Sequence, residues 1–134
     1  MKARQQSIRT QGRTDFVDIT GMVKEFVAEE GISDGVCFVY VPHTTAGVTI
    51  NENADPSVPE DVIGVLERLV PWEAGYRHTE GNSAAHVKAS LMGSSVAIPV
   101  DNGRLMLGTW QGVFFCDFDG PRTRKVILKV TSGE

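Results

Sequence analysis

The chain has 134 residues, of which 41% are hydrophobic and 22% charged, and its formal net charge is −4. This length and composition suit one globular domain with its own core, and the negative charge provides no basic field for holding nucleic acid. The longest apolar runs fall far short of the roughly 20 residues that a membrane-spanning helix needs. We therefore expect a single domain over residues 1–134, with neither a nucleic-acid nor a membrane partner.

Two features bear on the compartment. Cys37 and Cys116 each lie inside an apolar run, which is typical of buried, reduced thiols. The first 15 residues are basic but lack the apolar stretch of a secretory signal. Both features indicate a cytoplasmic protein.

The first 30 residues predict two strands and a helix. Residues 4–10 and 14–19 have strand-like patterns on either side of Gln11-Gly12, which predicts a hairpin. Thr20 is placed to N-cap a helix over residues 21–30, whose apolar residues recur at helical spacing.

The next segments predict two more strands. Residues 35–41 are apolar on both faces, and such a strand is typically central and covered on both sides. Residues 48–51 alternate between apolar and polar side chains, which predicts a strand with one face in water.

Two helices are expected in the middle of the chain. Residues 56–70 carry an apolar stripe at helical spacing and are followed by Pro71. A polar, irregular connection over 72–81 leads to a further helix over 83–91, which Gly93 ends.

The C-terminal third has a strand-like pattern, with Asp101-Asn102-Gly103 predicting a tight turn between its first two strands. The strands are expected over residues 95–100, 104–110, 112–118 and 125–131. Strands at both ends of the chain with helices between them favour an α+β fold, largely an antiparallel sheet or sandwich with about three helices.

The three histidines, His43, His78 and His86, lie beside strand ends, polar loops or a helix start. Three neutral imidazoles converging on one point would bind a divalent transition metal and leave a coordination position open. Their spacing matches no HxH or HExxH pattern, so surface or hydrogen-bonded structural histidines are the alternative interpretation.

A cluster of polar side chains follows the first of these histidines. Asn51, Glu52, Asn53 and Asp55 offer hard oxygen ligands or a general base, and Mg²⁺ with a diphosphate would suit them. The alternative is an Asx-rich turn in which Asp55 leads into the helix that begins at Pro56.

The start of the helix over 83–91 is a candidate anion site. Gly81-Asn82-Ser83 presents free backbone N–H groups, and Lys88 follows later in the helix. Plain capping by Asn82 or Ser83 explains the same residues.

Two further segments carry candidate ligand contacts. Gly108 and Gly112 bracket Trp110 and Gln111, so that Trp110 either stacks on a flat ligand ring or fills the core beside a bulged hairpin. Around Gly120-Pro121, Arg122 and Arg124 either hold phosphate bidentately or belong to a charged turn with Asp117 and Asp119.

These motifs together resemble the YjbQ-like proteins, also called UPF0047 or secondary thiamine-phosphate synthase enzymes. The resemblance covers nearly the whole chain in the same order. It rests on His43-Thr44-Thr45-Ala46-Gly47 with Asn51-Glu52-Asn53 and Asp55-Pro56, on His78, Asn82 and Ala85-His86-Val87-Lys88-Ala89-Ser90-Leu91, and on Leu107-Gly108-Thr109-Trp110-Gln111 with Asp119-Gly120-Pro121-Arg122.

The resemblance implies a compact α+β fold that assembles as a homotrimer with sites near the subunit interfaces. It implies that His43, His78 and His86 gather around a metal ion, and that the chain has a weak, secondary thiamine-phosphate synthase activity. Asp117 stands where such proteins often have Glu, and its side chain is one methylene shorter.

The first functional hypothesis is therefore an enzyme that joins a pyrimidine-methyl diphosphate to a thiazole phosphate and releases diphosphate at a metal-containing site. Zinc is the first choice for imidazole ligands, and magnesium is an alternative beside a diphosphate. The expected catalytic residues are Asp55, Asn51 and Lys88, and the expected substrate-binding residues are Thr44, Thr45, Asn53, Asn82, Ser83, Trp110, Gln111 and Arg122.

Two other functions fit the same residues. One is metal-dependent hydrolysis of a small phosphorylated or acyl substrate, with Asp55 or Glu80 as the base. The other is a non-catalytic trimer that binds a metal or a metabolite.

Overall fold

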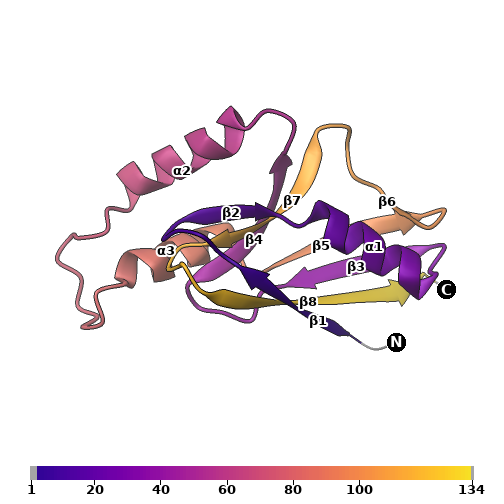
Figure 1. Cartoon of the computed structure of the whole chain (residues 1–134), viewed down its shortest axis with the longest axis horizontal. Coiled ribbons are helices and arrows are strands. Elements are labelled where there is room, and N and C mark those ends of the chain that lie inside the picture. Colours follow the sequence, from indigo (N-terminus) through magenta and orange to yellow (C-terminus); the bar gives the residue numbers. More distant parts are fainter. Residues whose placement is uncertain (1–2, 134) are drawn as a thin grey trace.

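The computed structural model describes residues 3–133, which form two antiparallel sheets and three helices (Figure 1). The larger sheet has the order β1-β8-β3-β5-β6, with strands β1 Arg4–Arg9, β8 Thr123–Ser132, β3 Gly35–Tyr40, β5 Ser95–Asp101 and β6 Arg104–Leu105. The smaller sheet has the order β2-β7-β4, with strands β2 Asp15–Asp18, β7 Gln111–Asp117 and β4 Ala46–Glu52. The helices are α1 Thr20–Glu30, α2 Ser57–Leu69 and α3 Ser83–Met92. The predicted α+β class, with largely antiparallel sheets and three helices, is confirmed.

The predicted hairpin at the start of the chain is wrong. β1 pairs with β8 in the larger sheet, whereas β2 pairs with β7 in the smaller one. The segment between them crosses from sheet to sheet and is held by the turn after β7, where Thr10 N–H donates to Arg122 O at 2.9 Å. β1 instead pairs over all six of its residues with the long strand β8.

The main core lies on the inner face of the larger sheet. Val23, Phe26 and Val27 of α1 are buried there against β3, β8 and the inner face of β7. The opposite face of β7 is covered separately, because Phe114 and Cys116 pack with Ala85 and Ala89 of α3. Every residue of β7 after Gln111 is buried, so both faces of this strand are covered.

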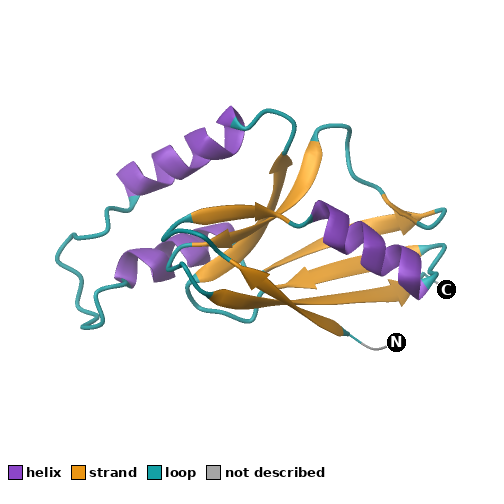
Figure 2. Ribbon diagram, viewed as in Figure 1, coloured by secondary structure: helices purple, strands orange, loops and turns teal. Residues whose placement is uncertain are grey.

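β3 confirms only half of its prediction. It is central, between β8 and β5, and its inward residues Cys37 and Val39 are fully buried. Its other face is open in the single chain, where Phe38 is 42% and Tyr40 46% exposed. The three helices cover other surfaces, as the view coloured by secondary structure shows (Figure 2), so the outer face of β3 has no partner among the described residues.

Some element ends differ from the prediction. Thr20 is the first residue of α1 and not its cap; its N–H and hydroxyl both donate to Asp18 Oδ1, and its hydroxyl accepts the N–H of Val113. β6 ends at Leu105 and does not continue to 110, and Trp110 is 63% exposed and not in the core. The tight turn before β6 is confirmed, with positive φ angles at Asn102 and Gly103.

Both cysteines are free and buried, as predicted. Burial raises the pKa of Cys37 to about 11 and also raises the pKa of Cys116. Neither thiol is therefore a ready nucleophile at neutral pH.

Within residues 3–133, no helix has both the length and the apolar character needed to cross a membrane.

Candidate functional site

A polar cavity of about 490 Å³ brings all three histidines to one place. Its residues come from the loop between β3 and β4, from the start of α3 and the loop before it, and from the turn between β7 and β8 together with the start of β8. The lining consists of Pro42, His43, Thr44 and Thr45, of His78, Glu80, Asn82 and His86, and of Asp119, Arg122 and Arg124. This volume is within the usual range for small-molecule sites.

Backbone hydrogen bonds hold the loop between β3 and β4 in position. Val41 N–H donates to Ser94 O at 2.8 Å, and Phe118 N–H donates to Thr45 O at 3.1 Å. His43 and Thr44 lie between these two anchored points, so that a well-ordered backbone supports this wall of the cavity.

A buried ion pair supports the same loop from β8. Arg124 Nη2 donates to Asp117 Oδ1 at 2.7 Å and to Thr45 Oγ1 at 2.7 Å. Asp117 is fully buried, and it also accepts hydrogen bonds from the Thr10 hydroxyl and the Asp119 N–H. Burial alone would raise the pKa of Asp117, but the hydrogen bonds and the charge of Arg124 lower it below its usual value.

Two buried polar atoms of cavity residues lack a hydrogen-bond partner among the described residues. They are Asn82 Oδ1, an acceptor, and Arg124 Nε, a donor. Asn82 is oriented by its amide, whose Nδ2 donates to Asp119 Oδ2 at 2.9 Å. A buried polar atom without a partner costs about 1–3 kcal/mol, so a bound molecule that pairs with both atoms would relieve this cost.

The histidines differ in their surroundings. Lys125 N–H donates to His43 Nε2 at 2.9 Å, which leaves Nδ1 as the ring nitrogen not used by the backbone. Burial, followed by the charge of Arg124, lowers the pKa of His43, so that the ring is neutral at pH 7. The rings of His78 and His86 lie with centroids 5.3 Å apart and planes at 86°.

The donor atoms around this cavity match the chemistry of a divalent transition metal, because three imidazoles and the carboxylates of Glu80 and Asp119 line it. Their positions do not form a complete ligand set. Among residues 3–133, no three His, Cys, Asp or Glu side chains are grouped closely enough to hold a metal ion.

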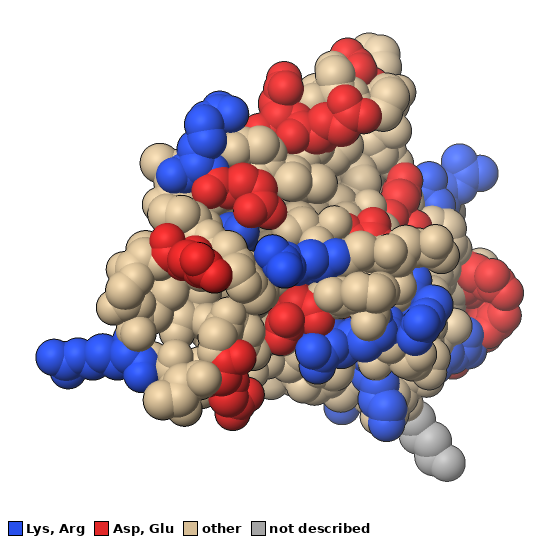
Figure 3. Space-filling model, turned by 60° about the vertical axis from the view of Figure 1, so that its left-hand side comes forward, with Lys and Arg blue, Asp and Glu red and all other residues tan. Residues whose placement is uncertain are grey.

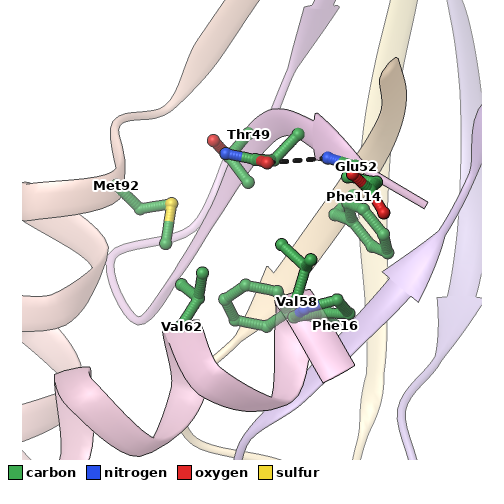
Figure 4. Close-up of a pocket in the computed structure, with 9 residues that line it drawn as sticks. Phe16, Thr49, Glu52, Val58, Val62, Met92 and Phe114 are labelled. Carbon is green, nitrogen blue, oxygen red and sulfur yellow. Dashed lines mark hydrogen bonds between the residues drawn. The ribbon is translucent and has the colours of Figure 1, made fainter. Parts of the chain in front are cut away.

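The predicted oxygen cluster lies elsewhere. Asn51 lines a small apolar cavity of about 50 Å³ between α2 and the smaller sheet, where Val58 and Val62 face Phe16 and Phe114 (Figure 4). Asn53 Nδ2 donates to Asp18 Oδ2 at 3.0 Å. Asp55 is exposed and accepts hydrogen bonds from the N–H and hydroxyl of Ser57, as expected of an Asx turn at a helix start.

Other predicted site residues also lie outside the histidine cavity. Lys88 is 1% exposed, and its Nζ lies 3.1 Å from Glu67 Oε2. Ser83 lines a separate cavity under the 72–81 loop. Trp110 and Gln111 are exposed, and Gln111 Oε1 accepts the Gly108 N–H at 2.8 Å. Of the predicted substrate-binding residues, the cavity brings together Thr44, Thr45, Asn82 and Arg122.

Arg124, predicted with Arg122 as a phosphate ligand, lines the cavity, but its buried pairing with Asp117 was not predicted, and Asp119 was expected only as part of a charged turn. A signal for Arg124 was present, because it has the same strand parity as Val126, Leu128 and Val130, which all face the core. A charged residue at an inward position of a strand needs a buried partner, and here that partner is Asp117.

The fold and this cavity define an α+β protein with a histidine-lined polar site. Residues 4–133 match the family model described as "UPF0047 protein YjbQ-like". The chain therefore belongs to the YjbQ/UPF0047 family.

Relatives and solved structures agree with this assignment. The UPF0047 protein YugU of Bacillus subtilis is 52% identical over 124 residues, which cover 92% of this chain and 94% of the relative. A crystal structure of a YjbQ/UPF0047 protein from Clostridium acetobutylicum is 54% identical with a TM-score of 0.94, covering 96% of this chain and 99% of that one. The structure of a hypothetical protein from Aeropyrum pernix is 38% identical, also with a TM-score of 0.94, covering 98% of this chain and 99% of that one.

Proposed function

We propose that the histidine-lined cavity binds a phosphorylated small molecule and that the chain is a weak thiamine-phosphate synthase. In that reaction a thiazole phosphate displaces diphosphate from a pyrimidine-methyl diphosphate. The observation that carries the proposal is the pair of buried, unpartnered atoms, Asn82 Oδ1 and Arg124 Nε, in the lining of one cavity with three imidazoles.

Arg122 is the group best placed to bind phosphate. Its side chain is half exposed, so the guanidinium is accessible from the cavity. The Asp119 carboxylate, 3.4 Å from Nη2, helps to hold the guanidinium in position. Arg124 is neutralised by Asp117 and contributes a directed N–H donor more than a free charge. Thr44 adds a hydroxyl at the cavity wall.

A divalent metal is part of the proposal. His43, His78 and His86 are the residues proposed to hold it, and their rings would have to come closer together than in this structure. Zinc is the first choice, with magnesium as an alternative beside a diphosphate. When bound, the ion would supply positive charge to the departing diphosphate. His43 would contribute through Nδ1, because Nε2 accepts the Lys125 N–H.

We assign no role in the cavity to the other predicted residues. Asp55, Asn51 and Lys88 make contacts of their own away from the histidines. Asn53, Ser83, Trp110 and Gln111 likewise do not line this cavity.

Hydrolysis of a small phosphorylated substrate is the second candidate. One observation favours it, namely that Glu80 lines the cavity and its Oε2 lies 4.0 Å from His78 Nε2. A carboxylate beside an imidazole suits a general base for water. Binding without turnover, by a non-catalytic protein, is the outcome expected if neither reaction is found.

A homotrimer is also proposed, with the outer face of β3 as a subunit contact. Phe38 and Tyr40 are exposed there, and their neighbours in register are Ala97 and Ser95 on β5 and Lys129 and Ile127 on β8. Exposed aromatic side chains over a flat sheet are typical of a surface that another subunit covers. Tyr40 lies two residues before Pro42, so this contact would adjoin the cavity.

To test the proposal, purified protein is incubated with both proposed substrates, and thiamine phosphate and diphosphate are measured. The two products should appear in equal amounts. Arg122→Ala should reduce turnover at least tenfold, about 1.4 kcal/mol or more in transition-state stabilisation. Arg104→Ala, at an exposed position on β6 away from the cavity, is the matched control. Phosphate release from the diphosphate alone, without the thiazole phosphate, would favour the hydrolase.

A further inference from the structure

A second cavity of about 430 Å³ adjoins the histidine cavity and shares His43, Thr44 and His86 with it. Its remaining lining differs in chemistry, because none of these side chains is charged. They are Ala46, Ala89, Ser90, Gly93 and Ser94. We call the cavity with Arg122 the charged lobe and this one the uncharged lobe; His43 and His86 border both.

The floor of the uncharged lobe is rigid. Gly93 O accepts the Val48 N–H at 3.1 Å, and Ser94 O accepts the Val41 N–H at 2.8 Å. Gly93 N–H in turn donates to Ala89 O at 2.9 Å, at the end of α3. These bonds tie the segment after α3 to β4 and to the end of β3, so the lobe is formed before any ligand arrives.

Small residues are required where α3 meets the sheet. A Cβ at Gly47 on β4 would lie 2.6 Å from Gly93 O, so only glycine permits this close approach. Ala46 and Ala89 are buried, and their methyl groups take up little of the space between helix and strand. The lobe is therefore a consequence of side-chain size at its walls.

We infer that the uncharged lobe holds the uncharged ring of the substrate whose phosphate lies in the charged lobe. This inference rests on the proposed function and specifies its substrate class as a phosphate or diphosphate ester of a ring-bearing alcohol. The alanines offer apolar surface to the ring. The Ser90 hydroxyl donates to His86 O at 2.9 Å and can therefore accept from a ring amino group, whereas the Ser94 hydroxyl can donate to a ring nitrogen or accept from an amino group.

The position of the histidines follows from the same geometry. A molecule that spans the two lobes passes His43 and His86, because these residues line both. Its ester linkage, which joins the ring-bearing carbon to the phosphate, lies beside the two imidazoles. In the proposed transfer reaction this linkage is the bond that breaks.

Calorimetric titration tests the inference with two probes, inorganic diphosphate and pyrimidine-methyl diphosphate. Because the ring adds buried apolar area, wild-type protein should bind the ester about tenfold or more tightly than inorganic diphosphate. Ser90→Leu and Ser94→Leu each fill the lobe and should remove this difference while affinity for inorganic diphosphate stays within about twofold. Ser7→Leu, an exposed position on β1, is the matched control and should retain the difference.

Other outcomes are distinguishable. Equal affinity of wild-type protein for both probes overturns the ring subsite but leaves phosphate binding in the charged lobe intact. No binding of either probe overturns the proposed function together with the inference. A changed oligomeric state in both leucine variants, measured by light scattering, would show that the lobe is a subunit contact and would also overturn the inference.

Discussion

At the scale of single residues, Asp117 determines the charge balance behind the cavity. Its carboxylate accepts from Arg124, Thr10 and the Asp119 N–H. The Asp117 carboxylate is thus fully used in buried contacts. It pairs with Arg124 and does not line the cavity.

We expect Asp117→Asn to destabilise the protein by about 3–5 kcal/mol, because it leaves the Arg124 charge buried without its counter-charge. Urea unfolding followed by circular dichroism measures the change. Asp61→Asn, an exposed position on α2, is the control and should change stability by less than about 0.5 kcal/mol. A loss of similar size in both variants would contradict the structural role.

The same carboxylate predicts a pH dependence. The pKa of Asp117 is lowered from its usual value of 3.8 in the folded chain, so the unfolded state takes up a proton first as the pH falls. The stabilisation by Asp117 is complete above that usual value and is lost as the pH falls through the lower folded pKa. Asp117→Asn should therefore show a shallower loss of stability in acid than the wild type, measured by urea unfolding at a series of pH values.

Metal content tests the histidines directly. Elemental analysis of wild-type protein should find close to one divalent metal per chain, and His43→Ala and His86→Ala should each lose it. Retention of the metal in both variants would contradict a site built on these imidazoles. Metal-free wild-type protein would leave them as hydrogen-bonding groups around a phosphate site.

At the scale of elements, α2 is held loosely compared with α1 and α3. It has no buried residue, and Val65 and Leu69 on its apolar stripe are 43% and 70% exposed. The same helix carries acidic residues. Figure 3 shows acidic side chains over the upper part of one face of the molecule and several basic side chains gathered at its lower right. Its clearest polar tie is Glu67, which accepts from the Thr14 hydroxyl and pairs with buried Lys88.

This tie predicts an asymmetry between two variants. Glu67→Ala leaves the buried ammonium of Lys88 without its carboxylate, and should destabilise the chain by roughly 1–3 kcal/mol, less than for a fully buried pair because Glu67 is partly exposed. Lys88→Met leaves only a partly exposed carboxylate and should be less destabilising. Thermal unfolding of both variants measures the order, and the reverse order would contradict this account of α2.

At the scale of the whole molecule, the open face of β3 predicts self-association. Analytical ultracentrifugation should find a trimer for the wild type, and Phe38→Glu should dissociate it, because a carboxylate cannot be buried against the sheet of another subunit without a partner. Val65→Glu on α2 replaces an apolar side chain of similar exposure, 43% against 42% for Phe38, and serves as the control. A wild-type monomer would contradict the proposed trimer.

Much of the architecture is local and was predictable from the sequence. The apolar stripe of Val58, Val62 and Leu66 predicted α2, and Asn102-Gly103 predicted the tight turn between β5 and β6. Both patterns depend only on residues that are close together in the sequence. The apolar residues on both faces of β7 likewise required cover on both sides. The sequence also identified the three histidines that line the cavity.

Only the tertiary structure decided which distant segments meet. Thr10 and Asp117 are 107 residues apart yet share a buried hydrogen bond, and the partner of β1 is the last strand of the chain. The sequence determined each element by its side-chain period and its glycines, since these depend on neighbours along the chain. The tertiary structure decided the strand partners, the open face of β3 and the meeting of the histidines, Asn82 and Arg124 in one cavity. These features depend on which apolar surfaces pack against each other and are thereby removed from water.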